Sequence, residues 1–98
     1  MNNIGINGFG RIGRSILRII VESNSDLNVI AINDLGDKET LSYLFKHDSI
    51  MGILNMNVEL EDDSLIVGDR KIKLISHSDP GEIPWSDLGV DLVVESTG

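Results

Sequence analysis

A glycine-rich segment near the amino terminus constrains the fold more than any other part of this sequence. Residues 8–13 read Gly-Phe-Gly-Arg-Ile-Gly. The short, uncharged run 2–7 before them predicts a buried strand, and Arg11–Glu22 after them predicts a helix. The apolar side of that helix is expected to consist of Ile12, Ile16, Ile19 and Ile20. A strand that turns through glycines into a helix is typical of α/β folds with a parallel sheet.

Each glycine of this segment has its own expected role. Gly8 permits a tight turn, Gly10 leaves room for backbone to approach a diphosphate, and Gly13 lets the helix pack close to the strand. The N–H groups at the helix start, including those of Arg11 and Ile12, face the same place and favour an anion. In this strand-to-helix context the pattern predicts dinucleotide binding.

An acidic residue completes the pattern. Leu27–Asn33 predicts a second strand, and its continuous apolar run suits a parallel strand covered on both faces. Asp34 follows directly, 21 residues after Gly13. Its carboxylate can accept hydrogen bonds from the ribose hydroxyls of adenosine and would repel a 2′-phosphate, so the predicted cofactor is NAD rather than NADP.

The next segments predict a helix and a loop. Asp37–Lys46 reads as a helix that Asp37 caps, and residues 47–56 show no clear period and read as a loop. The apolar side of this second helix is expected to hold Leu41, Leu44 and Phe45.

The last part of the chain predicts short strands. Val58–Leu60, Leu65–Val67 and Lys71–Ile75 are separated by turn residues and favour an antiparallel excursion. Pro84–Leu88 is expected to form one helical turn with Trp85 packed inward, and Val90–Glu95 to form the last strand.

Together these elements predict an α/β fold of the Rossmann type. We expect a doubly wound, mostly parallel sheet with an antiparallel hairpin excursion. No further crossover follows the last predicted strand, so residues 1–98 are expected to form an incomplete NAD-binding domain.

Composition excludes several classes of function. The 98 residues contain no cysteine, which excludes disulfides, cysteine-bound zinc and a thiol nucleophile within the chain. A formal charge of −8 argues against nucleic acid as a partner. There is no membrane-length apolar run and no signal peptide, so no membrane partner is expected and a cytoplasmic location is the default.

Isolated polar residues are expected to be structural. His47 and His77 read as surface or strand-end histidines, and Glu95 as a strand-end packing residue. Arg14 and Arg18 are expected on a solvent-facing side of the first helix. The acidic residues Glu59, Glu61, Asp62 and Asp63 lack the spacing of a calcium loop and predict a solvated hairpin turn, so no metal site is expected.

Segments along the whole chain resemble one known family. They are Ile6–Arg14, Ala31–Asp34, Lys46–Gly52, Asp79-Pro80, Trp85 and Val93–Gly98. With these landmarks the sequence resembles phosphorylating glyceraldehyde-3-phosphate dehydrogenase. The resemblance implies NAD on an amino-terminal Rossmann domain, with glyceraldehyde 3-phosphate oxidised in glycolysis, together with inorganic phosphate, to 1,3-bisphosphoglycerate. It also implies a homotetramer, the usual assembly of the family.

The resemblance also implies roles by position. Arg11 and Ile12 would give backbone N–H groups to the pyrophosphate, Asp34 would hold the adenosine ribose, and the segment 77–78 would meet the adenine through backbone carbonyls. Thr97 and Gly98 would approach the pyrophosphate and the nicotinamide ribose. The candidate cofactor-binding residues are therefore Asn7, Gly8, Gly10, Arg11, Ile12, Gly13, Asn33, Asp34, Ser78, Thr97 and Gly98.

The sequence departs from the family pattern in ways that leave alternatives open. The family often has Glu-Arg-Asp-Pro where residues 77–80 read His-Ser-Asp-Pro, and its nucleophilic cysteine lies beyond position 98. The resemblance therefore implies that no catalytic residue lies in this chain and that the catalytic domain is absent from it. The alternatives are erythrose-4-phosphate dehydrogenase, another NAD-dependent Rossmann dehydrogenase, and a non-catalytic nucleotide-binding or interaction module.

Overall fold

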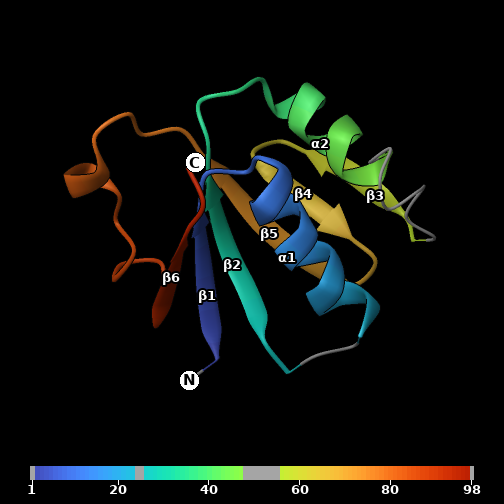
Figure 1. The fold of residues 1–98 in the computed structure, drawn as a ribbon, viewed down its shortest axis with the longest axis horizontal. Coiled ribbons are helices and arrows are strands. Elements are labelled where there is room, and N and C mark those ends of the chain that lie inside the picture. The colour runs from blue at the N-terminus through green and yellow to red at the C-terminus, as the bar shows by residue number, and fades with distance from the viewer. Residues whose placement is uncertain (1, 24–25, 48–55, 98) are drawn as a thin grey trace.

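The computed structural model describes residues 2–23, 26–47 and 56–97, which build one six-stranded sheet and two α-helices (Figure 1). In chain order the elements are β1 (Asn3–Asn7), α1 (Arg11–Glu22), β2 (Asn28–Asn33), α2 (Lys38–Lys46), β3 (Val58–Glu61), β4 (Ser64–Val67), β5 (Arg70–Ile75), the 3₁₀ turn η1 (Pro80–Glu82) and β6 (Leu92–Glu95). The strand and helix pattern predicted from the sequence is confirmed to within one or two residues at most element ends.

The sheet is mostly parallel, as predicted. Its strand order is β3-β4-β5-β2-β1-β6. β1 pairs in parallel with β2 and β6, and β2 pairs in parallel with β5. β3, β4 and β5 pair antiparallel and form the expected hairpin excursion at one edge. The carboxyl ends of four parallel strands therefore meet at one edge of the sheet, where ligands bind in α/β folds.

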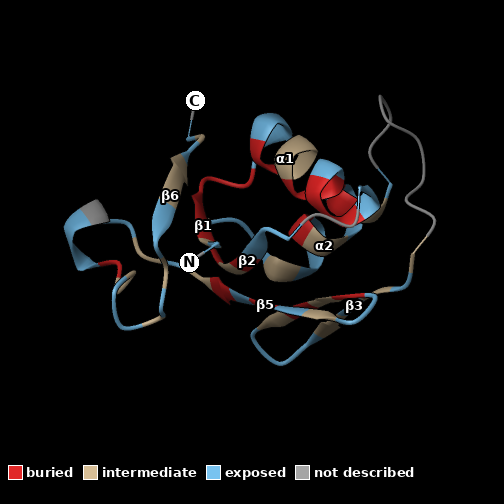
Figure 2. Cartoon of the chain, turned by 90° about the horizontal axis from the view of Figure 1, so that it is seen from below, coloured by how far each residue is buried: buried red, intermediate tan, exposed pale blue. Residues whose placement is uncertain are grey.

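Both helices lie on the same face of the sheet, and the hydrophobic core lies between the helices and the sheet (Figures 1 and 2). Apolar side chains of α1, α2 and the strands pack there because burial removes their surface from water. This core consists of Ile4, Ile6, Phe9, Leu17, Ile20, Val21, Val29, Ile32, Leu41, Phe45, Leu65, Val67, Ile72 and Leu74. The rings of Phe9 and Phe45 lie 5.8 Å apart and join the glycine segment to α2.

The apolar side predicted for α1 is only partly right. Ile20 is buried and Ile16 packs against the core, but Ile12 and Ile19 are 63% and 58% exposed. The side of α1 that meets the sheet is instead formed by Gly13, Leu17, Ile20 and Val21. The helix carries two apolar stripes, and the close approach at Gly13 selects the second one.

The solvent-facing position predicted for two arginines of α1 is wrong. Arg18 is only 4% exposed, and its Nε lies 3.4 Å from Oε2 of Glu22, one turn later. Arg14 is half-buried, and its Nη1 donates to the Phe9 carbonyl at 3.2 Å. Arg11 is exposed. The long aliphatic stems of arginine can cover apolar surface, which allows these positions beside the core.

Asp37 caps α2 as predicted. Its Oδ2 accepts from the backbone N–H of Thr40 at 3.1 Å and from the Thr40 hydroxyl at 3.0 Å. The hydrogen bond from the Thr40 backbone, followed by the one from its hydroxyl, lowers the pKa of Asp37 below its ordinary value of 3.8. Within this helix Leu41 and Phe45 are buried, whereas Leu44 is 36% exposed.

This lowered pKa predicts how the cap responds to acid. A carboxylate with a depressed folded-state pKa stabilises the protein above its unfolded-state value, and that contribution is lost as the pH falls through the folded value. We expect the thermal midpoint of Asp37→Asn to fall less than that of the wild type between neutral pH and about pH 3. Asp87→Asn, at an exposed turn position, controls for the lost charge. Equal falls in all three proteins would contradict the prediction.

The acidic turn between β3 and β4 is solvated, as expected. Glu59, Glu61, Asp62 and Asp63 are all exposed. Asp62 adopts a positive φ of 54°, a conformation that aspartate tolerates in tight turns. Asp63 accepts from Nζ of Lys38 at 3.0 Å, so this turn also meets the start of α2.

Trp85 packs inward against β1, as predicted. A Cβ built on Gly5 would lie 2.4 Å from Cζ3 and 2.6 Å from Cε3 of the Trp85 ring. Gly5 is buried in β1, so the ring rests directly on backbone where any other residue would carry a side chain. The same segment forms hydrogen-bonded turns between Pro84 and Gly89.

Gly5→Ala is expected to destabilise the protein by about 1–3 kcal/mol, because the added methyl must displace an indole ring from a packed site. Chemical denaturation gives this difference in the free energy of unfolding. In a Trp85→Leu background the same substitution should cost clearly less, which a double-mutant cycle detects. An equal cost in both backgrounds would show that the ring is not the obstacle.

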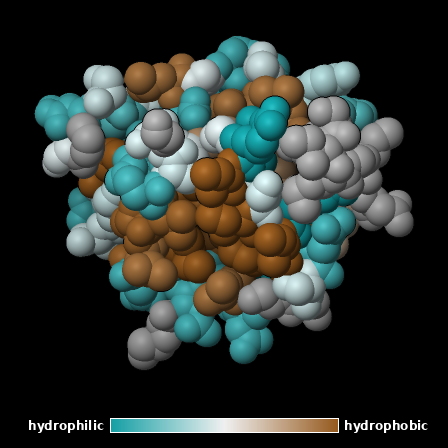
Figure 3. Space-filling view, in the orientation of Figure 1, coloured by the Kyte–Doolittle hydropathy of each residue, from teal (hydrophilic) through white to brown (hydrophobic). Residues whose placement is uncertain are grey.

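An apolar surface remains exposed on the helical face of the molecule. Figure 3 shows apolar side chains gathered over α1 and the neighbouring strands β1 and β6. The exposed large apolar residues of α1 and β6 are Ile12, Ile19 and Leu92. Within residues 2–23, 26–47 and 56–97, no helix is both long and apolar enough to cross a bilayer. Residues 48–55, which include most of the predicted loop 47–56, lie outside the described residues.

Candidate functional site

The glycine segment leaves β1 in a turn that only glycine can make without strain. Gly8 has a φ of +96°, and a Cβ there would lie 2.7 Å from the backbone N and Cα of Thr97. The Gly8 N–H donates to the carbonyl of Asn33 at 2.7 Å. The turn is thereby held against the ends of both β2 and β6.

Gly13 and Gly10 differ in what surrounds them. A Cβ on Gly13 would lie 2.5 Å from the Gly8 carbonyl and 3.2 Å from Cγ2 of Ile6, so the predicted close packing of helix on strand is confirmed. A Cβ on Gly10 would meet no heavy atom within 4 Å. Gly10 therefore borders open space, which is what backbone contact with a diphosphate requires.

The amino end of α1 borders that space. Gly10 is the N-cap residue of α1, and no side chain caps the helix with a hydrogen bond. The first turn also holds no acidic residue that would neutralise the positive end of the helix. The N–H groups that open the helix at Arg11 and Ile12 have no carbonyl of their own helix to bond, and both residues are exposed. This arrangement suits an anion.

The Asp34 carboxylate connects the glycine turn to the end of β2. Its Oδ2 accepts from the Phe9 N–H at 2.7 Å, and its Oδ1 accepts from the Gly36 N–H at 2.8 Å. Each carboxylate oxygen can accept a second hydrogen bond, so both can also receive a hydroxyl. The side chain is half-buried at the cleft, a position that suits the ribose contact predicted from the sequence.

A cleft of about 330 Å³ lies at this edge of the sheet. Seven of the predicted cofactor-binding residues line it, namely Asn7, Gly8, Gly10, Asn33, Asp34, Ser78 and Thr97. Gly13 is buried beneath the turn, and Arg11 and Ile12 begin the helix beside the cleft without lining it. Gly98 lies outside the described residues. Residues up to 90 positions apart in the sequence thus meet in one place.

His77, in the segment 77–78 that the resemblance assigned to the adenine, also lines the cleft. Three further lining residues were not singled out as cofactor contacts from the sequence, namely Leu35, Ile83 and Ser96. Leu35 is 65% exposed and Ile83 is 8% exposed, so the cleft has apolar surface on both the β2 side and the η1 side. Ser96 donates its hydroxyl to the Gly8 carbonyl at 2.5 Å. Their proximity to Asp34, Ser78 and Thr97 in the sequence is the only signal that could have indicated them.

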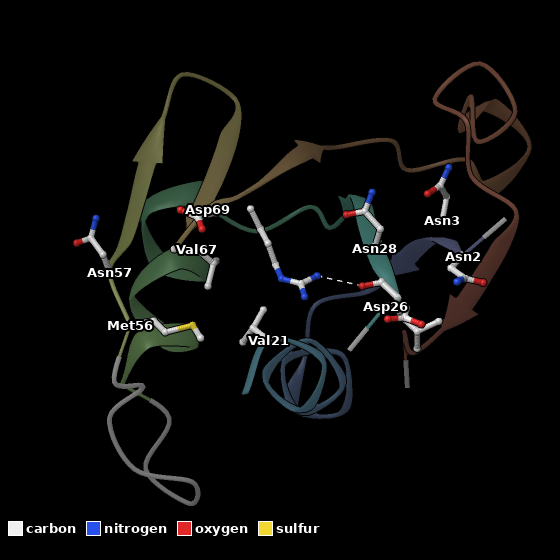
Figure 4. A pocket seen from close by; sticks show the side chains of 12 residues that line it. Asn2, Asn3, Val21, Asp26, Asn28, Met56, Asn57, Val67 and Asp69 are labelled. Atoms are coloured by element: carbon white, nitrogen blue, oxygen red, sulfur yellow. Dashed lines mark hydrogen bonds between the residues drawn. The ribbon is translucent and has the colours of Figure 1, made fainter. Parts of the chain in front are cut away.

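A larger hollow lies at the opposite end of the parallel strands. It has a volume of about 820 Å³, and amide and carboxylate side chains such as Asn28, Asn57 and Asp69 surround it (Figure 4). The Arg70 guanidinium donates to the Leu27 carbonyl there at 3.0 Å. This hollow is at the amino ends of the parallel strands, away from the glycine turn and the helix start. We therefore place the functional site in the smaller cleft.

No group of three or more histidine, aspartate or glutamate side chains within the described ranges is placed to hold a metal ion. Of the features that the site does present, three fit a dinucleotide. They are the open space at Gly10, the uncapped start of α1 and the carboxylate of Asp34.

The parallel sheet, the glycine turn and the acidic residue after β2 define a nucleotide-binding domain of the Rossmann type. Comparison with known proteins identifies the family. Residues 2–98 match the family model described as the NAD binding domain of glyceraldehyde 3-phosphate dehydrogenase. The chain belongs to this family, and NAD is its cofactor.

Individual relatives agree with the family model. The chain is 51% identical over 98 residues to glyceraldehyde-3-phosphate dehydrogenase 1 of Bacillus cereus, covering 100% of this chain and 29% of that protein. It is 52% identical over 95 residues to glyceraldehyde-3-phosphate dehydrogenase 1 of Streptomyces arenae, covering 97% of this chain and 28% of that protein. It is 52% identical over 99 residues to the Thermotoga maritima enzyme, covering 100% of this chain and 30% of that protein. The chain thus spans less than a third of the length of these relatives.

Proposed function

We propose that the chain is the cofactor-binding part of a phosphorylating glyceraldehyde-3-phosphate dehydrogenase, with NAD bound in the 330 Å³ cleft. The observation that carries the proposal is the Asp34 carboxylate. It bonds the Phe9 N–H of the glycine turn at 2.7 Å, beside an uncapped helix start. One carboxylate thereby sets the distance between a diphosphate position and a ribose position.

In this proposal, different residues in and beside the cleft bind different parts of the cofactor. The N–H groups of Arg11 and Ile12 take the pyrophosphate, and Asp34 takes the adenosine ribose. Ser78, which lines the cleft together with the apolar residues Leu35 and Ile83, is assigned to the adenine. When bound, NAD would be the hydride acceptor of the reaction. The chain's own residues bind and orient it, and the Asp34 charge disfavours the 2′-phosphate of NADP.

The catalytic apparatus belongs to another part of the protein in this proposal. The 98 residues contain no cysteine, so they hold no thiol that could attack the aldehyde. We assign residues 1–98 to one part of an NAD-binding Rossmann domain. As the family resemblance implies, the substrate is glyceraldehyde 3-phosphate, the reaction belongs to glycolysis, and the enzyme is a homotetramer. We place the enzyme in the cytoplasm, the location expected from the sequence.

Three measurements on the intact protein test the proposal. Calorimetry should show NAD binding that is much tighter than NADP binding, and absence of NAD binding would overturn it. Reduction of NAD with glyceraldehyde 3-phosphate should depend on inorganic phosphate. Faster turnover with erythrose 4-phosphate would reassign the substrate, and binding without turnover of either aldehyde would favour a non-catalytic module. Light scattering tests the tetramer.

A further inference from the structure

A continuous line of side-chain hydrogen bonds crosses the sheet at the cleft. Nδ2 of Asn7 donates to Oε1 of Glu95 at 2.7 Å, and Nδ2 of Asn33 donates to Oδ1 of Asn7 at 2.9 Å. At the far end, Asn33 donates to the His77 carbonyl at 3.1 Å and accepts from the His77 N–H at 2.7 Å. We call these four residues the amide line. They belong to β6, β1, β2 and the segment after β5, which are neighbours in the sheet.

The Glu95 carboxylate at one end and the His77 peptide group at the other fix the direction of the line. An ionised carboxylate only accepts hydrogen bonds, so Asn7 must turn its NH₂ group towards Glu95. Its oxygen then faces Asn33, which must in turn present its NH₂ group to Asn7 and its oxygen to the His77 N–H. The charged end and the His77 peptide group thus select the same amide orientations at the two asparagines, and the bond to the carboxylate is the charge-assisted one.

The Asn33 side chain has no donor left for a ligand. Its two amide hydrogens go to Asn7 and His77, and its oxygen accepts from the His77 N–H. Asn33 is 5% exposed and Asn7 is 6% exposed, so each presents little surface to the cleft that it lines. The side-chain donors of Asn33 therefore contribute to nucleotide binding only through the residues that they hold.

The two ends of the amide line adjoin residues on two sides of the cleft. His77 and Ser78 line it beyond β5, and Ser96 and Thr97, which follow Glu95, line it beyond β6. Asn33 is the side chain that grips the His77 peptide group on both its N–H and its C=O. Because β5 ends at Ile75, two residues earlier, this grip continues the sheet pairing through a side chain.

We propose that Asn7 and Asn33 are positioning residues, which hold the 77–78 segment and the end of β6 at the separation that the nucleotide requires. The inference rests on the proposed function, in that NAD occupies this cleft. It adds that the affinity for NAD depends on two buried amides that do not contact it through their side-chain donors, and on the carboxylate that orients them.

Asn33→Ala tests the grip on the segment after β5. Without nucleotide, hydrogen exchange at the His77 amide should accelerate by about tenfold or more, because its acceptor is lost. The affinity of the intact protein for NAD, measured by calorimetry, should fall by about tenfold. Unchanged affinity with accelerated exchange would show that the segment is held but does not matter to the nucleotide, which overturns the proposal.

An exchange of groups between positions 7 and 95 tests the direction of the line and includes a rescue. Asn7→Asp places two carboxylates together and should weaken NAD binding by about tenfold or more. Adding Glu95→Gln supplies an NH₂ group to the new carboxylate and keeps the bond from Asn33, with the wild-type net charge. The double variant should therefore bind NAD within about threefold of the wild type.

The outcomes separate this inference from the proposed function. A wild-type protein that does not bind NAD refutes the proposed function by itself. If the wild type binds NAD and the double variant binds NAD as weakly as Asn7→Asp does, the loss of affinity does not come from the broken amide line, and the proposal fails. Glu95→Gln alone retains an acceptor for Asn7 but loses the charge that orients it, so its affinity for NAD should lie between those of the wild type and Asn7→Asp.

Discussion

Gly10→Ala is expected to weaken NAD binding by about tenfold or more, with the free energy of unfolding within about 0.5 kcal/mol of the wild type. A Cβ at this position meets no heavy atom within 4 Å, and the φ of −81° suits any residue. The new methyl therefore costs the fold little but occupies the space in which a diphosphate would approach the start of α1. Calorimetry with NAD and chemical denaturation measure the two effects separately.

Gly8→Ala is the matched control, because the same methyl group is added two residues earlier. There it meets the Thr97 backbone at 2.7 Å and requires a φ of +96°, so we expect a loss of about 3 kcal/mol or more in the free energy of unfolding. The two variants should thus separate binding from folding. A Gly10→Ala protein with wild-type affinity for NAD would show that the diphosphate does not lie at this turn.

Asp34→Ala is expected to weaken NAD binding by about 1–3 kcal/mol, because a charge-assisted hydrogen bond to the ribose is lost. The structure adds a second consequence. The N–H groups of Phe9 and Gly36 lose their acceptor, so the glycine turn should also become less stable. Calorimetry at matched temperature and salt measures the first effect, and hydrogen exchange at the Phe9 amide measures the second.

Asp34→Asn distinguishes charge from geometry. The amide oxygen can still accept from one of the two N–H groups, so part of the stability should remain, while the repulsion of a 2′-phosphate disappears. We expect the preference for NAD over NADP to shrink in both variants. An affinity for NAD equal to that of the wild type in Asp34→Ala would remove this residue from the ribose site.

The local elements of the fold could be predicted because their signals are short-range. The glycine spacing, the apolar run of β2 and the Asp37 cap each depend on residues within about one helical turn or one strand. The side of α1 that is buried could not be predicted in the same way. That helix has two stripes of aliphatic residues, and either could face the sheet. The stripe beside Gly13 is buried because the helix approaches the Gly8 carbonyl so closely there that a Cβ on Gly13 would lie 2.5 Å from it.

The buried Arg18 and the amide line show the same dependence on distant parts of the chain. Asn7 and Glu95 are 88 positions apart, and Asn33 and His77 are 44 positions apart. As separate polar residues at strand ends, they carry no sequence signal that they bond to one another. Parallel pairing brings their strand ends to one edge, and only the register of that pairing makes the side chains neighbours.

The sequence by itself determined the strand–turn–helix unit, the acidic residue after β2 and the family, because each depends on residue types at fixed spacing along the chain. The tertiary structure alone decided which face of α1 is buried, that Asp34 holds the glycine turn, and that two asparagines connect the sides of the cleft. The reason is physical. Burial and hydrogen bonding depend on which atoms meet in space, and here those atoms come from strands whose order in the sheet differs from their order in the chain.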